Sequence, residues 1–133
     1  MLRLESEIGT TLPEQYRSFL FQYNGGIPSP NIVDVDKATG MPTDVQEFFG
    51  VRQRLESSNI SWNAQTFADR LPGGLLPIAC DSGGNLFCLS LSGEDLGSVV
   101  YAAFDTRVPE FYPVAIDVGA FLAKLRDWPF THH

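Results

Sequence analysis

The stretch "LPEQYRSFLFQYNGG", residues 12–26, decides the fold prediction. Pro13 suits the first turn of a helix, where a backbone N–H has no partner inside the helix. Apolar side chains then recur at the i, i+3, i+4, i+7 spacing of one helix face: Tyr16, Phe19, Leu20 and Tyr23. The Asn-Gly-Gly of residues 24–26 favours the left-handed backbone that ends a helix, and Pro28 and Pro30 prevent its continuation. The stretch therefore predicts a core helix that stops and turns the chain sharply.

The rest of the chain predicts an α+β fold, with helices packed against a mainly antiparallel sheet. Helices are expected at residues 2–8, at 61–71 with Ser61 as the N-cap, and from an Asp117 cap to about residue 128. Strands are expected at residues 31–35, 45–49, 75–81, 85–91, 98–104 and 111–116. The last strand contains Pro113, which is tolerated at a sheet edge. The middle strands are apolar on both faces, which predicts helices on one face and partial cover on the other.

Composition indicates one globular domain, which we place at residues 1–131. The chain has 133 residues, of which 44% are hydrophobic, and a formal net charge of -7. Such an acidic surface argues against nucleic acid and anionic membranes as ligands. It fits a basic protein partner, because opposite charge speeds encounter, although solubility alone also explains it.

A cytoplasmic location is expected, because no basic-then-apolar leader and no run of about 18 apolar residues occurs. Cys80 and Cys88 lie on the two arms of a predicted hairpin, where a three-residue loop would place them opposite each other. A cross-strand disulfide would then be geometrically allowed, but free thiols are the expectation in a cytoplasmic chain. The terminal His132 and His133 are interpreted as the remnant of a purification tag.

Residue types that carry chemistry are scarce. Histidine is absent outside the terminal pair, which excludes Ser-His-Asp catalysis, Cys-His catalysis and histidine metal sites. The acidic loop "DVDKATG" at residues 34–40 fails as a calcium loop, because Thr39 stands at the turn glycine and Val45 at the bidentate glutamate. The loop "DSGGN" at residues 81–85 joins two strands, so it is interpreted as a turn rather than a phosphate cradle. The sequence therefore predicts no cofactor and no metal.

Together these motifs resemble the SUKH superfamily, which includes fungal cell-wall-synthesis regulators of the Smi/Knr type and many bacterial toxin-immunity proteins. Residues 12–26 are similar to its Leu-Pro-acidic-x-Tyr helix ending in Asn-Gly-Gly. Residues 70–105 are similar to its central strands: a Leu-Pro-Ile-Ala arm, a Gly-Gly-Asn turn and a Gly-x-Val-Tyr strand. "VQEFFGV" and "FLAKL" also match, so the resemblance covers nearly the whole chain. One departure is Ala103-Phe104-Asp105, where family members often carry tryptophan before the acidic residue.

The resemblance implies a binding module rather than an enzyme. Bacterial members are thought to bind a cognate toxin, often a nuclease, and to block it, whereas eukaryotic members act as hubs in cell-wall signalling. The leading expectation is therefore an immunity protein that neutralises a toxin domain, as a monomer or weak homodimer. The alternative is a regulatory or scaffold module without a toxin partner. A carboxylate-dependent hydrolase is a third hypothesis, which would need a pocket holding two carboxyl groups with perturbed pKa values.

Charge and loop placement suggest which residues would meet a basic toxin. Carboxylates in turns could take the place of the phosphates that a nuclease binds, and their attraction would be salt-dependent. The candidate partner-binding residues are Asp34, Asp36, Asp44, Glu47, Glu94 and Asp95.

Overall fold

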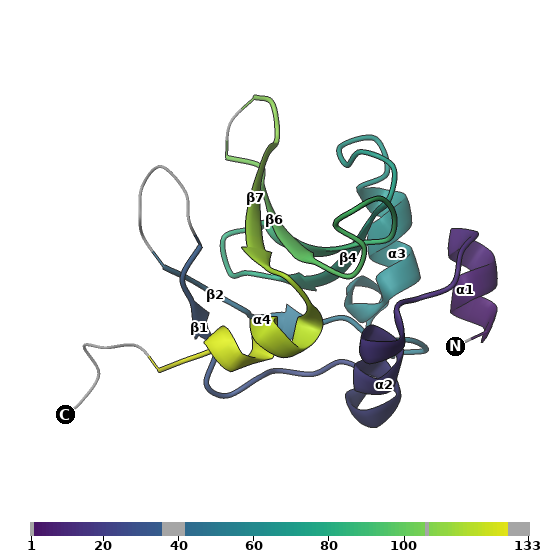
Figure 1. Ribbon diagram of the computed structural model, residues 1–133, viewed down its shortest axis with the longest axis horizontal. Coiled ribbons are helices and arrows are strands. Elements are labelled where there is room, and N and C mark those ends of the chain that lie inside the picture. Colours follow the sequence, from purple (N-terminus) through teal and green to yellow (C-terminus); the bar gives the residue numbers. More distant parts are fainter. Residues whose placement is uncertain (1, 36–41, 106, 128–133) are drawn as a thin grey trace.

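The computed structural model describes residues 2–35, 42–105 and 107–127, in which helices surround one main sheet (Figure 1). The helices in these ranges are α1 (Leu2–Ile8), α2 (Glu14–Tyr23), the 3-10 helix η1 (Glu56–Ser58), α3 (Ile60–Thr66) and α4 (Val118–Lys124). The strands are β1 (Ile32–Val33), β2 (Thr43–Asp44), β3 (Glu47–Phe48), β4 (Leu75–Cys80), β5 (Leu86–Ser90), β6 (Val99–Ala103) and β7 (Glu110–Ala115).

Strands β3 to β7 form one sheet in chain order, and each pairs antiparallel with the next. Strands β1 and β2 form a separate ribbon, in which Ile32 lies opposite Asp44. Every residue of β5 is buried, whereas the edge strand β7 is largely exposed. Pro113 lies in that edge strand, as predicted, where its missing N–H interrupts no inner ladder. The predicted α+β class is confirmed.

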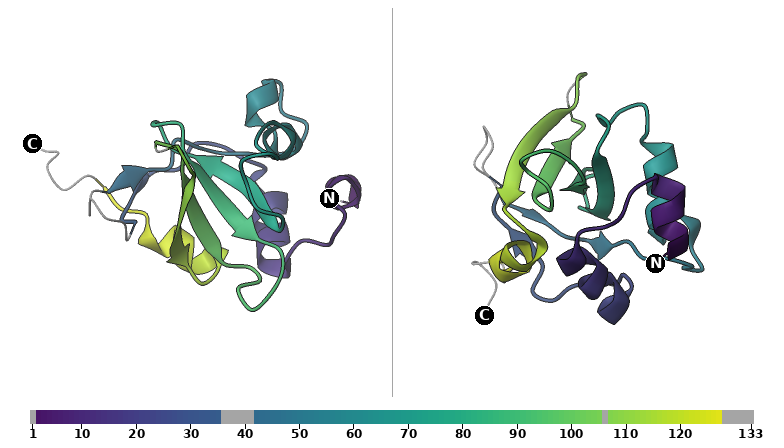
Figure 2. Two further views of the ribbon diagram at one scale, coloured as in Figure 1. Left: turned by 90° about the horizontal axis from the view of Figure 1, so that it is seen from above. Right: turned by 45° about the vertical axis from the view of Figure 1, so that its right-hand side comes forward.

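One face of the sheet packs against α2 and α4. Phe87 of β5 and Tyr101 of β6 are cross-strand neighbours on this face. Phe121 of α4 contacts Phe87, with ring centroids 5.2 Å apart. Tyr16 and Leu20, from the predicted apolar stripe of α2, are both buried. Figure 2 shows α2 and α4 next to one another on this side, so the two helices close the core together.

The opposite face is covered in part by α3, which packs against β4. Just beyond this helix, Phe67 stacks on Phe104 at a centroid separation of 5.6 Å and an interplanar angle of 15°. The guanidinium of Arg70 lies 4.2 Å from the centroid of the Phe104 ring. Phe104 therefore fills the gap between the sheet and the segment after α3.

Both ends of helix α3 differ from the prediction. Helix α3 begins at Ile60 with Asn59 as the N-cap residue, so the predicted Ser61 cap is wrong. The Asn59 side chain instead accepts a 2.8 Å hydrogen bond from the backbone N–H of Gln53, which ties it to the preceding loop. Helix α3 also ends at Thr66 rather than residue 71, since the chain then enters turns before β4.

Helix α4 is capped by Asp117, as predicted: its carboxylate accepts a 2.7 Å hydrogen bond from the N–H of Ala120. The helix ends at Lys124 instead of about residue 128. Arg126 and Ile32 exchange two backbone hydrogen bonds of 2.8 and 2.9 Å. This pairing requires extended backbone at the helix end, so a contact with β1 shortens α4.

The hairpin of β4 and β5 does not place the two cysteines opposite each other. Cys80 lies opposite Leu86 and Cys88 opposite Pro77, so the register expected for a cross-strand disulfide was wrong. Both cysteines are free. Burial raises the pKa of the Cys88 thiol to about 12. For Cys80, burial and then neighbouring carboxylates raise the pKa to about 11, so both thiols stay protonated at neutral pH.

Candidate functional site

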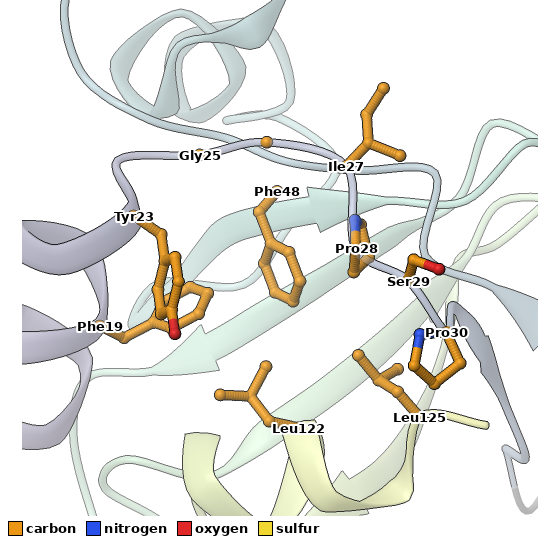
Figure 3. Close-up of a pocket in the computed structure, with 11 residues that line it drawn as sticks. Phe19, Tyr23, Gly25, Ile27, Pro28, Ser29, Pro30, Phe48, Leu122 and Leu125 are labelled. Atoms are coloured by element: carbon orange, nitrogen blue, oxygen red, sulfur yellow. The ribbon is translucent and has the colours of Figure 1, made fainter.

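An apolar groove opens where α2 ends (Figure 3). Its cavity volume is about 370 Å³. It is bounded by the end of α2, the loop that follows, one side chain of β3 and the end of α4. The lining residues are Phe19, Tyr23, Gly25, Gly26, Ile27, Pro28, Ser29, Pro30, Phe48, Leu122 and Leu125.

Aromatic packing forms the floor of the groove. Phe19 contacts Phe48 edge-to-face with ring centroids 5.0 Å apart, and Phe48 contacts Phe121 in the core at 6.0 Å. The rim stays open to solvent: the exposed fraction is 59% for Tyr23 and 81% for Ile27. A well-packed floor under exposed apolar walls is the arrangement that receives an apolar side chain from another molecule.

The Asn-Gly-Gly turn fixes this rim in place. Asn24 adopts the left-handed conformation, with φ 46° and ψ 52°, and ends α2 as predicted. Its side-chain amide donates to the carbonyl of Val51 at 3.1 Å and accepts from the N–H of Val51 at 2.8 Å. Gly26 and Phe48 exchange two backbone hydrogen bonds of 3.1 and 2.7 Å. The turn is thus bonded to the chain around β3, which holds α2 and the loop after it against the sheet.

The groove offers little chemistry. Among its lining residues the phenol of Tyr23 is the single ionisable side chain, and the Ser29 hydroxyl the other polar side-chain group. Neither has an acid or base beside it in the lining. Across the described ranges, no cluster of three or more His, Cys, Asp or Glu residues has the geometry of a metal site. The groove suits binding through shape and apolar contact.

The structure places the predicted acidic residues in separate regions. Asp34, just after β1, is held by Arg126 in a two-pronged ion pair with N–O distances of 2.7 and 3.1 Å. The Arg126 hydrogen bonds lower the pKa of the Asp34 carboxyl. Asp36, which sequence reasoning also selected, lies outside the described residues.

Asp44 and Glu47 lie at the end of the sheet near the β4–β5 turn. Asp44 accepts hydrogen bonds from the backbone N–H and the hydroxyl of Ser82, at 3.0 and 2.9 Å. Glu47 accepts a short hydrogen bond from the Ser58 hydroxyl. Both carboxylates are therefore partly engaged inside the protein.

Glu94 and Asp95 lie in the turn between β5 and β6, which is the opposite end of β5 from the β4–β5 turn. Both residues are exposed. Among the described residues, neither carboxylate forms an ion pair or accepts a hydrogen bond, which distinguishes this pair from Asp34, Asp44 and Glu47. The candidates therefore do not form one continuous patch.

Sequence reasoning passed over Asp81, which accepts more side-chain hydrogen bonds than any other carboxylate in the described ranges. Asp81 is only 3% exposed. It accepts hydrogen bonds from the hydroxyls of Tyr101 and Thr43, from the backbone N–H of Gly83, and from the backbone and side chain of Asn85. Burial by itself raises the pKa of this carboxyl, but the hydrogen bonds from Tyr101, Asn85 and Thr43 outweigh it and lower the pKa.

The Asp81 network explains the "DSGGN" motif as turn chemistry, as predicted. Its donors come from the turn itself, from β2 and from β6, so one carboxylate joins three parts of the chain. The motif signalled a turn through its glycines. Nothing in it signalled the distant tyrosine and threonine partners.

Comparison with known proteins identifies the family of this chain. A family model described as "SMI1-KNR4 cell-wall" (SUKH_6) matches residues 2–122. The chain is 27% identical over 144 residues to the SPbeta prophage-derived uncharacterized protein YokK of Bacillus subtilis (strain 168), covering 95% of this chain and 72% of that protein. No solved structure matches significantly. No helix among the described residues is long and apolar enough to cross a membrane. The family match spans most of the chain, and this protein belongs to the SUKH (SMI1-KNR4) family.

Proposed function

We propose that this protein is a non-enzymatic, cytoplasmic binding module that neutralises a toxin domain by stoichiometric contact. The observation that carries the proposal is the groove beside the Asn-Gly-Gly turn, an exposed apolar recess built on a rigid aromatic floor and without catalytic groups. Such a recess supports recognition of a protein side chain. Family membership supports a role in protein–protein interaction.

The acidic residues add the electrostatic part of the proposal. The chain carries a net charge of -7. In this proposal Asp34, Asp36, Asp44, Glu47, Glu94 and Asp95 attract a basic toxin and help to occlude its active or substrate-binding surface. Exposed carboxylates raise the association rate more than they lengthen the lifetime of a complex. The effect depends on salt, because the Debye length is about 10 Å at 0.1 M ionic strength.

Charge reversal tests this proposal. The partner used is a candidate toxin domain from the gene neighbourhood, in catalytically inactive form. Replacing all six carboxylates with lysine should slow association by about tenfold or more at low salt, and the difference should shrink at high salt. Stopped-flow or surface-plasmon measurements give the rates. An unchanged association rate after replacement of all six carboxylates would contradict the proposed electrostatic attraction. Absence of any complex would contradict the proposal that the partner is a toxin.

A control for folding is needed, because three of the five carboxylates that the structure describes have partners inside the protein. Asp34 bonds Arg126, Asp44 bonds Ser82, and Glu47 bonds Ser58. The pair Glu94→Lys and Asp95→Lys avoids this complication. Its thermal unfolding should match that of the unaltered protein, so any change in association rate reports on the encounter alone.

The alternative is a regulatory or scaffold module without a toxin partner. It is favoured by the name of the matching family, "SMI1-KNR4 cell-wall". The gene neighbourhood and direct binding measurements distinguish the two proposed functions. A neighbouring toxin gene whose product forms a tight, salt-sensitive complex supports immunity, whereas reproducible binding to purified signalling or cell-wall proteins, with no toxin bound, supports the scaffold.

A further inference from the structure

A second apolar surface lies on the outer side of β6 and β7, away from Phe121 and the core. Val100 and Pro113 are cross-strand partners on this side, and Phe111 lies two residues along β7 on the same face. The next turns add Leu96 and Ile116. We call these five residues the β6–β7 face.

Four of the five side chains of this face are exposed, and Val100 is half-buried. The exposed fraction is 58% for Leu96, 38% for Phe111 and 82% for Ile116. Helix α3 packs against β4 near the far edge of the sheet, and α4 approaches β7 from the side of Phe87 and Phe121. Figure 1 shows β7 at the margin of the sheet with α3 beside β4. Exposed apolar side chains grouped in this way mark interaction surfaces.

The face is hollowed as well as apolar. A cavity of about 530 Å³ lies between the β5–β6 turn and β7. Its lining residues are Glu94, Asp95, Leu96, Ser98, Val100, Pro113, Val114, Ala115 and Ile116. The lining thus combines aliphatic side chains with two carboxylates and contains no basic residue.

The two carboxylates indicate the chemistry of the occupant. Glu94 and Asp95 are exposed, and within the described residues neither is neutralised by an ion pair or a hydrogen bond. Protein interfaces commonly have an apolar centre and a charged rim that fixes partner and orientation. The complementary surface would present aliphatic or aromatic side chains flanked by lysine or arginine.

We infer that the β6–β7 face, with Glu94 and Asp95 at its rim, docks an amphipathic basic segment of a partner protein. This inference rests on the proposed function and assigns its electrostatic contact to one surface. A basic segment that also presents apolar side chains satisfies both parts of the hollow. The groove of Figure 3 offers shape without charge, so it selects less strongly for a basic partner.

Self-association through the same strand is disfavoured. Pro113 removes one N–H donor from the β7 edge, which weakens strand addition. Two copies of a chain with a net charge of -7 also repel each other. A second copy of this chain is therefore an outcome of the test rather than the proposed occupant.

The first experiment uses the full chain, labelled with ¹⁵N, and a synthetic amphipathic helix composed of leucine and lysine. Addition of this peptide at low salt should shift amide resonances of residues 94–100 and 110–116. Matched peptides with lysine replaced by glutamate, or leucine replaced by serine, should leave them unchanged. Shifts centred on residues 23–30, shifts scattered over the surface, or no binding would each overturn the inference.

Matched variants sharpen the result. Ile116→Ser should weaken peptide binding by about tenfold, as truncation of an interface anchor does. Ile27→Ser is the control, because Ile27 is equally exposed (81% against 82%) but lines the other groove. Glu94→Lys with Asp95→Lys should abolish the salt dependence of binding, whereas Glu14→Lys, an exposed acid on α2, should preserve it. Equal loss of affinity for Ile116→Ser and Ile27→Ser would contradict the assignment.

The inference and the proposed function can fail separately. If the neighbouring toxin domain binds and the Ile116 and Glu94/Asp95 variants retain its affinity, the inference is wrong and the proposed function stands. If the peptide maps to the β6–β7 face but no toxin domain binds, the surface stands and the toxin proposal is wrong. Concentration-dependent dimers that lose their contact in Ile116→Ser would assign the face to a second copy and overturn the inference.

Discussion

Replacing Asp81 with alanine is expected to destabilise the folded protein by about 4 kcal/mol, because several buried donors lose a shared acceptor and each such loss costs about 1–3 kcal/mol. The change would remove the carboxylate that accepts hydrogen bonds from the hydroxyls of Tyr101 and Thr43 and from the N–H groups of Gly83 and Asn85. Urea unfolding followed by tryptophan fluorescence or circular dichroism measures the loss. The β4–β5 turn, β2 and β6 should lose stability together, because the Asp81 carboxylate joins all three.

Asp81→Asn is expected to cost less, about 2 kcal/mol. The asparagine oxygen can still accept from the N–H groups of Gly83 and Asn85. Its amide group can face Tyr101, whose hydroxyl can rotate to accept a hydrogen bond. Asp95→Ala, at an exposed position in the next turn, serves as the control and should change the unfolding free energy by less than about 0.5 kcal/mol. Equal stability of Asp81→Ala and Asp95→Ala would contradict the network.

The same carboxylate makes stability depend on pH. The pKa of Asp81 in the folded protein is lower than its ordinary value, which is about 3.9 in an unfolded chain. As the pH falls below about 4, the unfolded state therefore binds a proton first. The contribution of Asp81 to stability is complete above that pH and is lost as the pH falls through the folded pKa. Asp81→Asn should have a flatter stability profile between about pH 5 and pH 2.

Local signals in the sequence predicted those elements whose ends are determined locally. The α2 stripe, its Asn24 stop and the Asp117 cap each depend on residues within one or two helical turns. The structure has the stop and the cap, and it buries Tyr16 and Leu20 of the stripe but leaves Tyr23 exposed. Strands β4 to β7 were placed within about a residue for a similar reason, because apolar runs between turn residues mark them. The α+β class follows from these elements.

Elements with ends set by distant contacts were predicted less well. Helix α4 stops early because Arg126 pairs with Ile32, which lies far away in the sequence. Helix α3 takes Asn59 as its first flanking residue because that side chain is bonded to the loop at Gln53. Neither contact leaves a signature in the local sequence, so propensity alone cannot place these boundaries.

The candidate sites also combine features that the local sequence signals with features that depend on distant contacts. Acidic turn residues could be selected from the sequence, yet their separation to opposite ends of β5 depends on sheet topology. The groove is assembled from residues 19–30, from Phe48 and from the end of α4, which no single motif links. The sequence predicted an edge strand at residues 111–116 and a sheet face that helices cover only in part, but nothing in it linked β7 to the β5–β6 turn, which lines the same hollow.

Gly50→Ala is expected to cost about 3 kcal/mol, the upper part of the range for overpacking a rigid site. A Cβ atom at Gly50 would lie 2.5 Å from the carbonyl oxygen of Asn24 and 2.8 Å from its Oδ1. These atoms cannot move freely, because Asn24 is bonded to Val51 and its carbonyl accepts from the Gln53 side chain. Gly50 itself is fixed by 2.9 Å backbone hydrogen bonds with Ser58 and Ile60.

Three further alanine variants separate the effect of close packing from that of backbone strain. They are Gly25→Ala, Gly26→Ala and Gly73→Ala. Gly25 combines a φ of +88° with a contact of 3.0 Å to the Phe48 carbonyl, so about 2 kcal/mol is expected. Gly26 has a φ of +123° but open space around it, so its cost of about 1 kcal/mol reports backbone strain alone. Gly73 has neither feature and is the control.

The order of melting temperatures separates two explanations of the Asn-Gly-Gly turn. If the turn only ends α2, Gly25→Ala and Gly26→Ala should lose stability while Gly50→Ala, which is outside the helix cap, resembles Gly73→Ala. If the turn docks α2 against the chain after β3, Gly50→Ala should be the least stable of the four. We expect the second result, because the Asn24 amide completes both backbone hydrogen bonds of Val51 and leaves no room for a methyl group at Gly50.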